Sequence, residues 1–221
     1  MLIKYLFSLL LIVISLSTIS YAQKSEFIFT NGNNVVRNGS IQAKESAHIE
    51  AYGDTKVFAY DNSIIKATDN VIVEAFGNSQ VIARDNCHVI AHDNSRISAF
   101  NDSQIEAIGS STIICKDRSS LNAKGSCQIS SYDNSQVTVY DNCNVMAYEN
   151  SKVKLFDKAN AMTFNKCIVD MFNNSIVKAY NNCIITAKDD SKIFAYDECK
   201  VKASKGVEVE LFNKASKVIL K

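Results

Sequence analysis

Apolar and polar side chains alternate along most of the chain in a repeat of eight residues. From Ile41 to Val209 the first position of each octad is Val, Ile or Leu, with Ala161 as the exception, and the third position is Ala in 15 of 22 octads. Side chains two residues apart lie on one side of an extended backbone, so this pattern predicts a short strand with one buried face. A helix would place apolar residues three and four positions apart, and the octads lack that spacing.

A polar corner follows each predicted strand. The fifth position is Asp, Asn or Gly in 19 of the 21 octads from Gly53 to Asn213, and these residues adopt left-handed backbone readily. A strand this short cannot bury its face alone, whereas stacked copies can, so the repeat predicts an all-β fold, a parallel β-solenoid. The chain contains no proline, which agrees because interior strands donate hydrogen bonds to the ladder.

The fourth position indicates how many octads form one coil. Two octads would give a flat coil, and three would give a triangular one. When every second octad is aligned, the fourth positions form an unbroken aromatic column of Tyr132, Tyr148, Phe164, Tyr180, Tyr196 and Phe212. We therefore expect two octads per coil and about eleven coils, stacked roughly 4.8 Å apart into a rod of roughly 50 Å.

The ends of the chain depart from the repeat. Residues 1–22 carry Lys4, a short apolar run and small residues at Ser20 and Ala22, a pattern that predicts a secretory signal peptide cleaved before Gln23. We expect residues 23–40 to form an N-terminal cap and residues 41–221 to form the octapeptide-repeat solenoid. The expected location is therefore secreted, at the cell surface or in the periplasm, with no transmembrane span after signal cleavage.

Composition narrows the classes of partner. The chain has 24 Lys and Arg against 23 Asp and Glu, and this balance argues against nucleic-acid binding, which needs a basic excess. The three histidines are scattered, and no nucleophile with its base, carboxylate pair or phosphate cradle stands out. We therefore expect no enzyme activity and no cofactor.

Cysteines occupy the seventh position of six octads, where Ser is otherwise most common. Two sets have members two octads apart and would stack in adjacent coils: Cys127 with Cys143, and Cys167 with Cys183 and Cys199. They are either buried free thiols that fill the corner or, since export provides an oxidising environment, disulfides between coils. The sequence leaves both interpretations open.

One corner column also collects carboxylates. Asp117, Asp133 and Glu149 recur in every second octad, and stacked carboxylates between coils would suit calcium. The octads lack the glycine-rich pattern of calcium-binding β-rolls, so the favoured interpretation is that these are solvated turn residues and that the chain holds no metal.

The repeat unit Asp93-Asn94-Ser95-Arg96-Ile97-Ser98-Ala99 resembles the repeats of trimeric autotransporter adhesin heads. Those heads are parallel β-rolls on bacterial surfaces, so the resemblance implies surface adhesion. The aromatic column fits that role, because exposed apolar stripes often mark contacts with a surface glycan, a protein or a second copy of the chain.

Other roles stay open at this point. The column equally fits a structural or self-assembling solenoid spacer without a ligand, in which stacked rings steady the sheet. An ice-binding solenoid is less favoured, because it needs a flat regular array, usually rich in Thr, and here the second position varies among Phe58, Lys66, Glu74 and Ile82.

Overall fold

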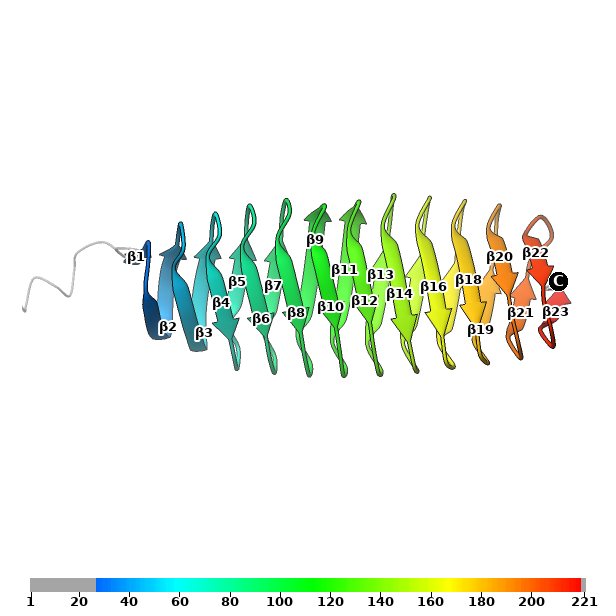
Figure 1. Cartoon of the computed structure of the whole chain (residues 1–221), viewed down its shortest axis with the longest axis horizontal. Coiled ribbons are helices and arrows are strands. Elements are labelled where there is room, and N and C mark those ends of the chain that lie inside the picture. The colour runs from blue at the N-terminus through cyan, green and yellow to red at the C-terminus, as the bar shows by residue number, and fades with distance from the viewer. Residues whose placement is uncertain (1–26, 220–221) are drawn as a thin grey trace, which may run out of the picture.

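The chain folds into a rod of stacked parallel strands. A computed structural model describes residues 27–219, and these residues form 23 strands joined by tight corners in a parallel β-solenoid (Figure 1). The solenoid has about 12 turns, and each turn has about 16 residues, the coil length that the aromatic spacing predicts. The predicted signal peptide, residues 1–22, lies outside the described residues.

Each turn contributes one strand to each of two faces. Face A consists of β1 (Phe27–Phe29), the C-terminal parts of β2 (Asn33–Ala43) and β3 (His48–Ala59), β5 (Ile72–Ala75), β7 (His88–Ala91), β9 (Gln104–Gly109), β11 (Ser120–Gly125), β13 (Gln136–Val139), β15 (Lys152–Leu155), β17 (Ile168–Met171), β19 (Ile184–Ala187), β21 (Lys200–Ala203) and β23 (Ser216–Ile219). Face B consists of the N-terminal parts of β2 and β3, β4 (Ile64–Ala67), β6 (Gln80–Ala83), β8 (Arg96–Ala99), β10 (Thr112–Cys115), β12 (Gln128–Ser131), β14 (Asn144–Tyr148), β16 (Asn160–Phe164), β18 (Ile176–Tyr180), β20 (Lys192–Ala195) and β22 (Glu208–Leu211).

Neighbouring strands pair in parallel with an offset of two octads. Ile129 lies beside Val145, for example, and Val145 beside Ala161, so each octad position forms a column along the rod. This register keeps the same kind of side chain together, and a slip of one residue would turn every apolar side chain outward.

The interior is thin and apolar. The first, third and seventh positions are buried in nearly every turn, and the second and eighth positions point outward. Small Ala at the third position lets the two faces approach closely. In the middle of the rod larger residues replace it, among them Leu155 and Met171, and there Ala161 replaces the usual Val at the first position. The smaller Ala161 offsets part of the volume that these larger side chains add.

Left-handed backbone at the fifth position makes each corner. From Glu45 to Asn213 every fifth position has a positive φ except Lys205, where the following Gly206 takes the positive φ instead. Glycine is required where corners approach most closely, because a Cβ on Gly125 would lie 2.6 Å from the carbonyl oxygen of Gly109.

In several turns the seventh position closes the corner with a hydrogen bond to the carbonyl three residues before it. The Ser103 hydroxyl donates to the Phe100 carbonyl at 2.8 Å, and the Cys87 thiol donates to the Arg84 carbonyl at 3.0 Å. Serine and cysteine are therefore interchangeable there, since both are small and both donate to the same backbone acceptor.

The two ends of the rod are less regular than its middle. β1 and β2 extend the stack with a shifted register, because Phe27 pairs with Ile41, which is fourteen residues away and not sixteen. These two strands form a turn beyond the eleven expected. At the other end β22 and β23 leave apolar side chains exposed, and Val218 is 62% exposed. Within residues 27–219 there is no helix of the length and apolar character needed to cross a membrane.

Candidate binding surface

The aromatic column runs along face B as a continuous stack of rings, which we call the aromatic ladder. Adjacent ring centroids lie 4.5–5.2 Å apart and the ring planes differ by 8–12°. The two-octad register produces this geometry, because each ring projects from the same position of successive coils. The ladder consists of Tyr132, Tyr148, Phe164, Tyr180, Tyr196 and Phe212.

The stacking determines which parts of the rings a partner can reach. Each inner ring has a neighbour on both sides, so its faces are covered and its edge points to solvent. At one end the Lys116 ammonium lies 5.4 Å from the centre of the Tyr132 ring, and at the other end Phe212 is 38% exposed. A sugar that stacks on an aromatic face would find an open face only at Phe212, whereas a partner that packs against ring edges and tyrosine hydroxyls would find the whole ladder.

Face A carries shorter stacks of the same kind. Phe156 stacks on Tyr140 at 4.9 Å and on Phe172 at 4.7 Å. Nearer the N-terminus, Phe76 stacks on Tyr60 at 5.1 Å and on the His92 imidazole at 4.7 Å. His92 is thus a member of an aromatic stack.

A shallow groove of about 600 Å³ lies beside the ladder on face B. The strand segments at Ile129, Val145 and Ala161 form its floor, and Met146 and Met162 form the wall next to the ladder. Both methionines are exposed. We did not expect this groove from the sequence, although Met at the second position of two successive face-B octads was its signal.

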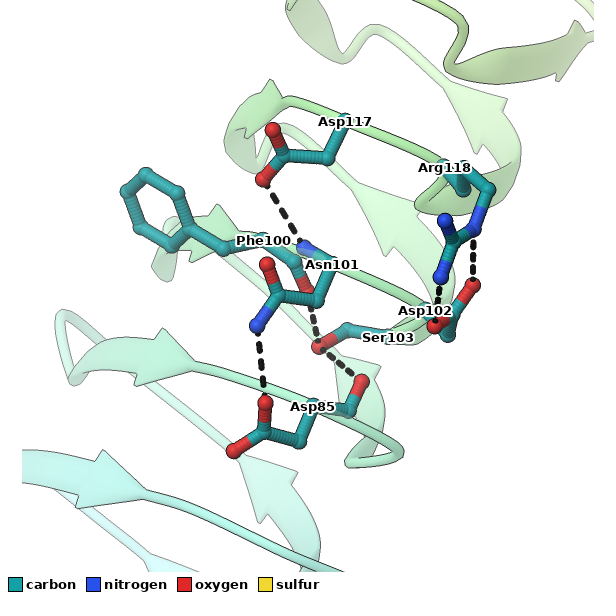
Figure 2. A network of polar contacts seen from close by, with 7 residues as sticks. All are labelled: Asp85, Phe100, Asn101, Asp102, Ser103, Asp117 and Arg118. Atoms are coloured by element: carbon teal, nitrogen blue, oxygen red, sulfur yellow. Dashed lines mark hydrogen bonds and ion pairs between the residues drawn. The ribbon is translucent and has the colours of Figure 1, made fainter.

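The candidate calcium ligands take part in backbone hydrogen bonds between coils. Asp117 Oδ2 accepts the Asn101 N–H at 3.0 Å (Figure 2). In the next coil, Asp133 Oδ2 accepts the Asp117 N–H at 3.4 Å. Glu149 continues the column, with a φ of 53°. Nowhere in the part of the chain that the structure describes do three His, Cys, Asp or Glu side chains converge as metal ligands would.

An ion pair also links these coils. The Arg118 guanidinium donates from Nε and Nη2 to the two carboxylate oxygens of Asp102 at 2.7 and 2.6 Å (Figure 2). The hydrogen bond from Arg118 lowers the pKa of the Asp102 carboxyl. Both side chains are exposed, so this pair adds little to stability.

All seven cysteines are buried free thiols. The two sets with members two octads apart, Cys127 with Cys143 and Cys167 with Cys183 and Cys199, each form a column at a corner. Burial raises the pKa of Cys87 to about 11 and that of Cys115 to about 12. Because all seven side chains are buried inside the solenoid, these thiols serve packing.

Comparison with known proteins gives no relative to guide the interpretation. The chain matches no family model, and no curated protein or solved structure is significantly similar to it. The function must therefore be argued from the ladder, the groove and the fold.

Proposed function

We propose that this chain is an exported, non-enzymatic binding module that adheres to a partner at the cell surface through the aromatic ladder. The observation that carries the proposal is the ladder itself, an uninterrupted stripe of aromatic side chains on one face of a straight rod. A stripe of this kind offers a large and rigid contact area at low entropic cost, because its rings are already ordered by their neighbours.

The ring geometry favours a protein partner over a glycan. Ring edges and tyrosine hydroxyls suit a flat protein surface, which packs against edges and supplies hydrogen-bond partners. The partner is either another protein or a second copy of this chain.

A structural spacer without a ligand is the second candidate. It is favoured by the same stacking, because rings that cover one another contribute to the stability of the rod without any partner.

A ladder variant with a matched control separates the two candidates. The ladder variant replaces Tyr148, Tyr180 and Tyr196 with Ser and disrupts all five stacked contacts. The control replaces face-A aromatics with Ser, at Tyr140, Phe156 and Phe172.

The purified proteins are coupled to beads, and the retention of the beads on extracellular matrix proteins and on a glycan array is compared. Sedimentation velocity measures self-association. Folding is checked by circular dichroism. Adhesion or self-association that is lost in the folded ladder variant and kept in the control supports the binding module. If the wild type binds nothing and the ladder variant has merely lost stability, the chain is a spacer.

A further inference from the structure

The groove beside the ladder has an uneven chemistry along its length. Methionine side chains form one wall, at Met146 and Met162, and the exposed Ile176 lies at the C-terminal end of the groove. Methionine is unbranched and polarisable, so a wall of methionines adapts to a flexible apolar ligand. The volume of about 600 Å³ falls within the range of small-molecule sites.

The opposite wall consists of the side-chain amides of Gln128, Asn144 and Asn160. Two of these amides already have partners in their own corners. The Asn144 Nδ2 donates to the Asn142 carbonyl at 3.5 Å, and the Asn160 Nδ2 donates to the Lys158 carbonyl at 3.3 Å. This wall is a polar rim that does not require hydrogen bonds from a ligand, so the groove suits an alkyl chain better than a sugar chain.

The groove contains one charge, at its C-terminal end. Lys178 lines the groove, and no Asp or Glu does. The Lys178 ammonium makes no ion pair among residues 27–219 and lies 5.9 Å from the centre of the Phe194 ring. The carboxylates of Glu208 and Glu210 further along face B are paired with Lys192 at 2.6 and 3.4 Å. An anion that reaches this end therefore meets an unpaired cation.

The dimensions favour one extended chain. The two walls are columns of side chains two residues apart along each strand, so the groove is roughly 7 Å wide between them. The groove crosses five coils and is therefore roughly 19 Å long. A second copy of the protein is a poor occupant, because this footprint is far below the roughly 800 Å² per partner of a stable interface. An extended peptide repeats every roughly 7 Å and would not match coils spaced by roughly 4.8 Å, whereas an alkyl chain has no register to match.

We infer that this methionine groove binds a free single-chain amphiphile with an anionic head group, of the long-chain fatty acid class. The alkyl chain lies between the methionine and amide columns, and the carboxylate lies at Lys178. The inference does not rest on the adhesive role of the ladder, since the groove and its charge are separate features of face B.

The test is calorimetric titration of the purified chain with laurate below its micellar concentration. Dodecyltrimethylammonium supplies the same alkyl chain with a cationic head, and acetate supplies the head without the chain. We expect one laurate per chain and an affinity about fivefold above that for the cationic amphiphile, a ratio appropriate to one exposed charge.

Two variants and a control locate the site. Met146→Ser with Met162→Ser removes the apolar wall and is expected to weaken laurate binding about tenfold, because two thioether chains no longer cover the ligand. Lys178→Gln is expected to abolish the preference for the anionic head. Lys154→Gln, an exposed lysine at the same octad position on face A, is expected to change neither. All four side chains point outward, so the circular dichroism spectrum should not change.

Several outcomes would overturn the inference. These are no saturable laurate binding, equal affinity for both head groups in the wild type, unchanged binding in the double methionine variant, and binding of acetate as tight as that of laurate. Association with phosphatidylglycerol vesicles without binding of monomeric laurate would also overturn it. Laurate binding by a chain that adheres to nothing would reject the proposed function and leave this inference intact.

Discussion

The corner at Asn101 allows the geometry of the repeat to be tested by substitution. Asn101 has a φ of 57°, and its backbone N–H donates to Asp117. Its side-chain Nδ2 donates to Asp85 Oδ1 at 2.7 Å, so the residue joins the coils on both sides (Figure 2). A substitution can remove the side-chain bond alone or remove it together with the tolerance for left-handed backbone.

The expected magnitudes differ between glycine and alanine. Asn101→Gly keeps the left-handed backbone and loses the bond to Asp85, at a cost of about 1 kcal/mol for an exposed hydrogen bond. Asn101→Ala loses the same bond and keeps a Cβ in left-handed backbone without the polar side chain that lets Asn tolerate it, at about 1–2 kcal/mol more. Glycine also gains about 0.5–1 kcal/mol of conformational entropy in the unfolded chain, which offsets part of the difference. We therefore expect alanine to be the less stable variant by about 0.5–1 kcal/mol.

Urea unfolding followed by far-ultraviolet circular dichroism measures this order. The matched control is Asn122, which lies at an outward position within β11, where alanine should be more stable than glycine because a strand interior disfavours glycine. Opposite orders at the two sites are the expected result. An Asn101→Ala protein as stable as the glycine variant would refute the account of the corner.

Three further predictions concern the core, the thiols and the stacking. Leu155→Ala should destabilise the protein by about 2–5 kcal/mol, because a fully buried side chain leaves a cavity, and Lys154→Ala should stay within about 0.5 kcal/mol in the same urea assay. A thiol reagent at pH 8 should label none of the seven cysteines in the native protein and all of them in urea, since every one of these side chains is buried; rapid native labelling would contradict this. Deletion of residues 73–88, one complete coil, should leave the spectrum per residue unchanged, and loss of the strand signal would count against interchangeable coils.

The octad pattern was sufficient to predict the strands and the corners. Two apolar positions separated by one outward residue define a half-buried strand, and Asp, Asn or Gly at the fifth position defines where the backbone becomes left-handed. The aromatic column then distinguished coils of two octads from coils of three, because only the shorter coil aligns Tyr132 with Phe212 in one unbroken stack. The described structure has this register throughout its middle.

The surface features were less accessible from the sequence. The alignment of rings in a column was predictable, but the covering of their faces by neighbouring rings depends on side-chain rotamers that the repeat does not specify. The groove depends on several outward residues of moderate size along five coils, with Lys178 at its end, and no single motif marks it. The additional turn formed by β1 and β2 was also missed, because its register is offset from the octads.

The two-octad coil is tested most directly by a distance between two outward residues on face A. Asn122 and Lys202 occupy the same octad position five coils apart, and both are exposed. Both residues are replaced with Cys, and spin labels are attached under native conditions. Pulsed electron paramagnetic resonance should then give a narrow distribution of distances centred at about 24 Å, which is five coil spacings. A distribution centred at about 16 Å would contradict the account, because this is the axial distance for coils of three octads. A broad distribution without a maximum would also contradict it.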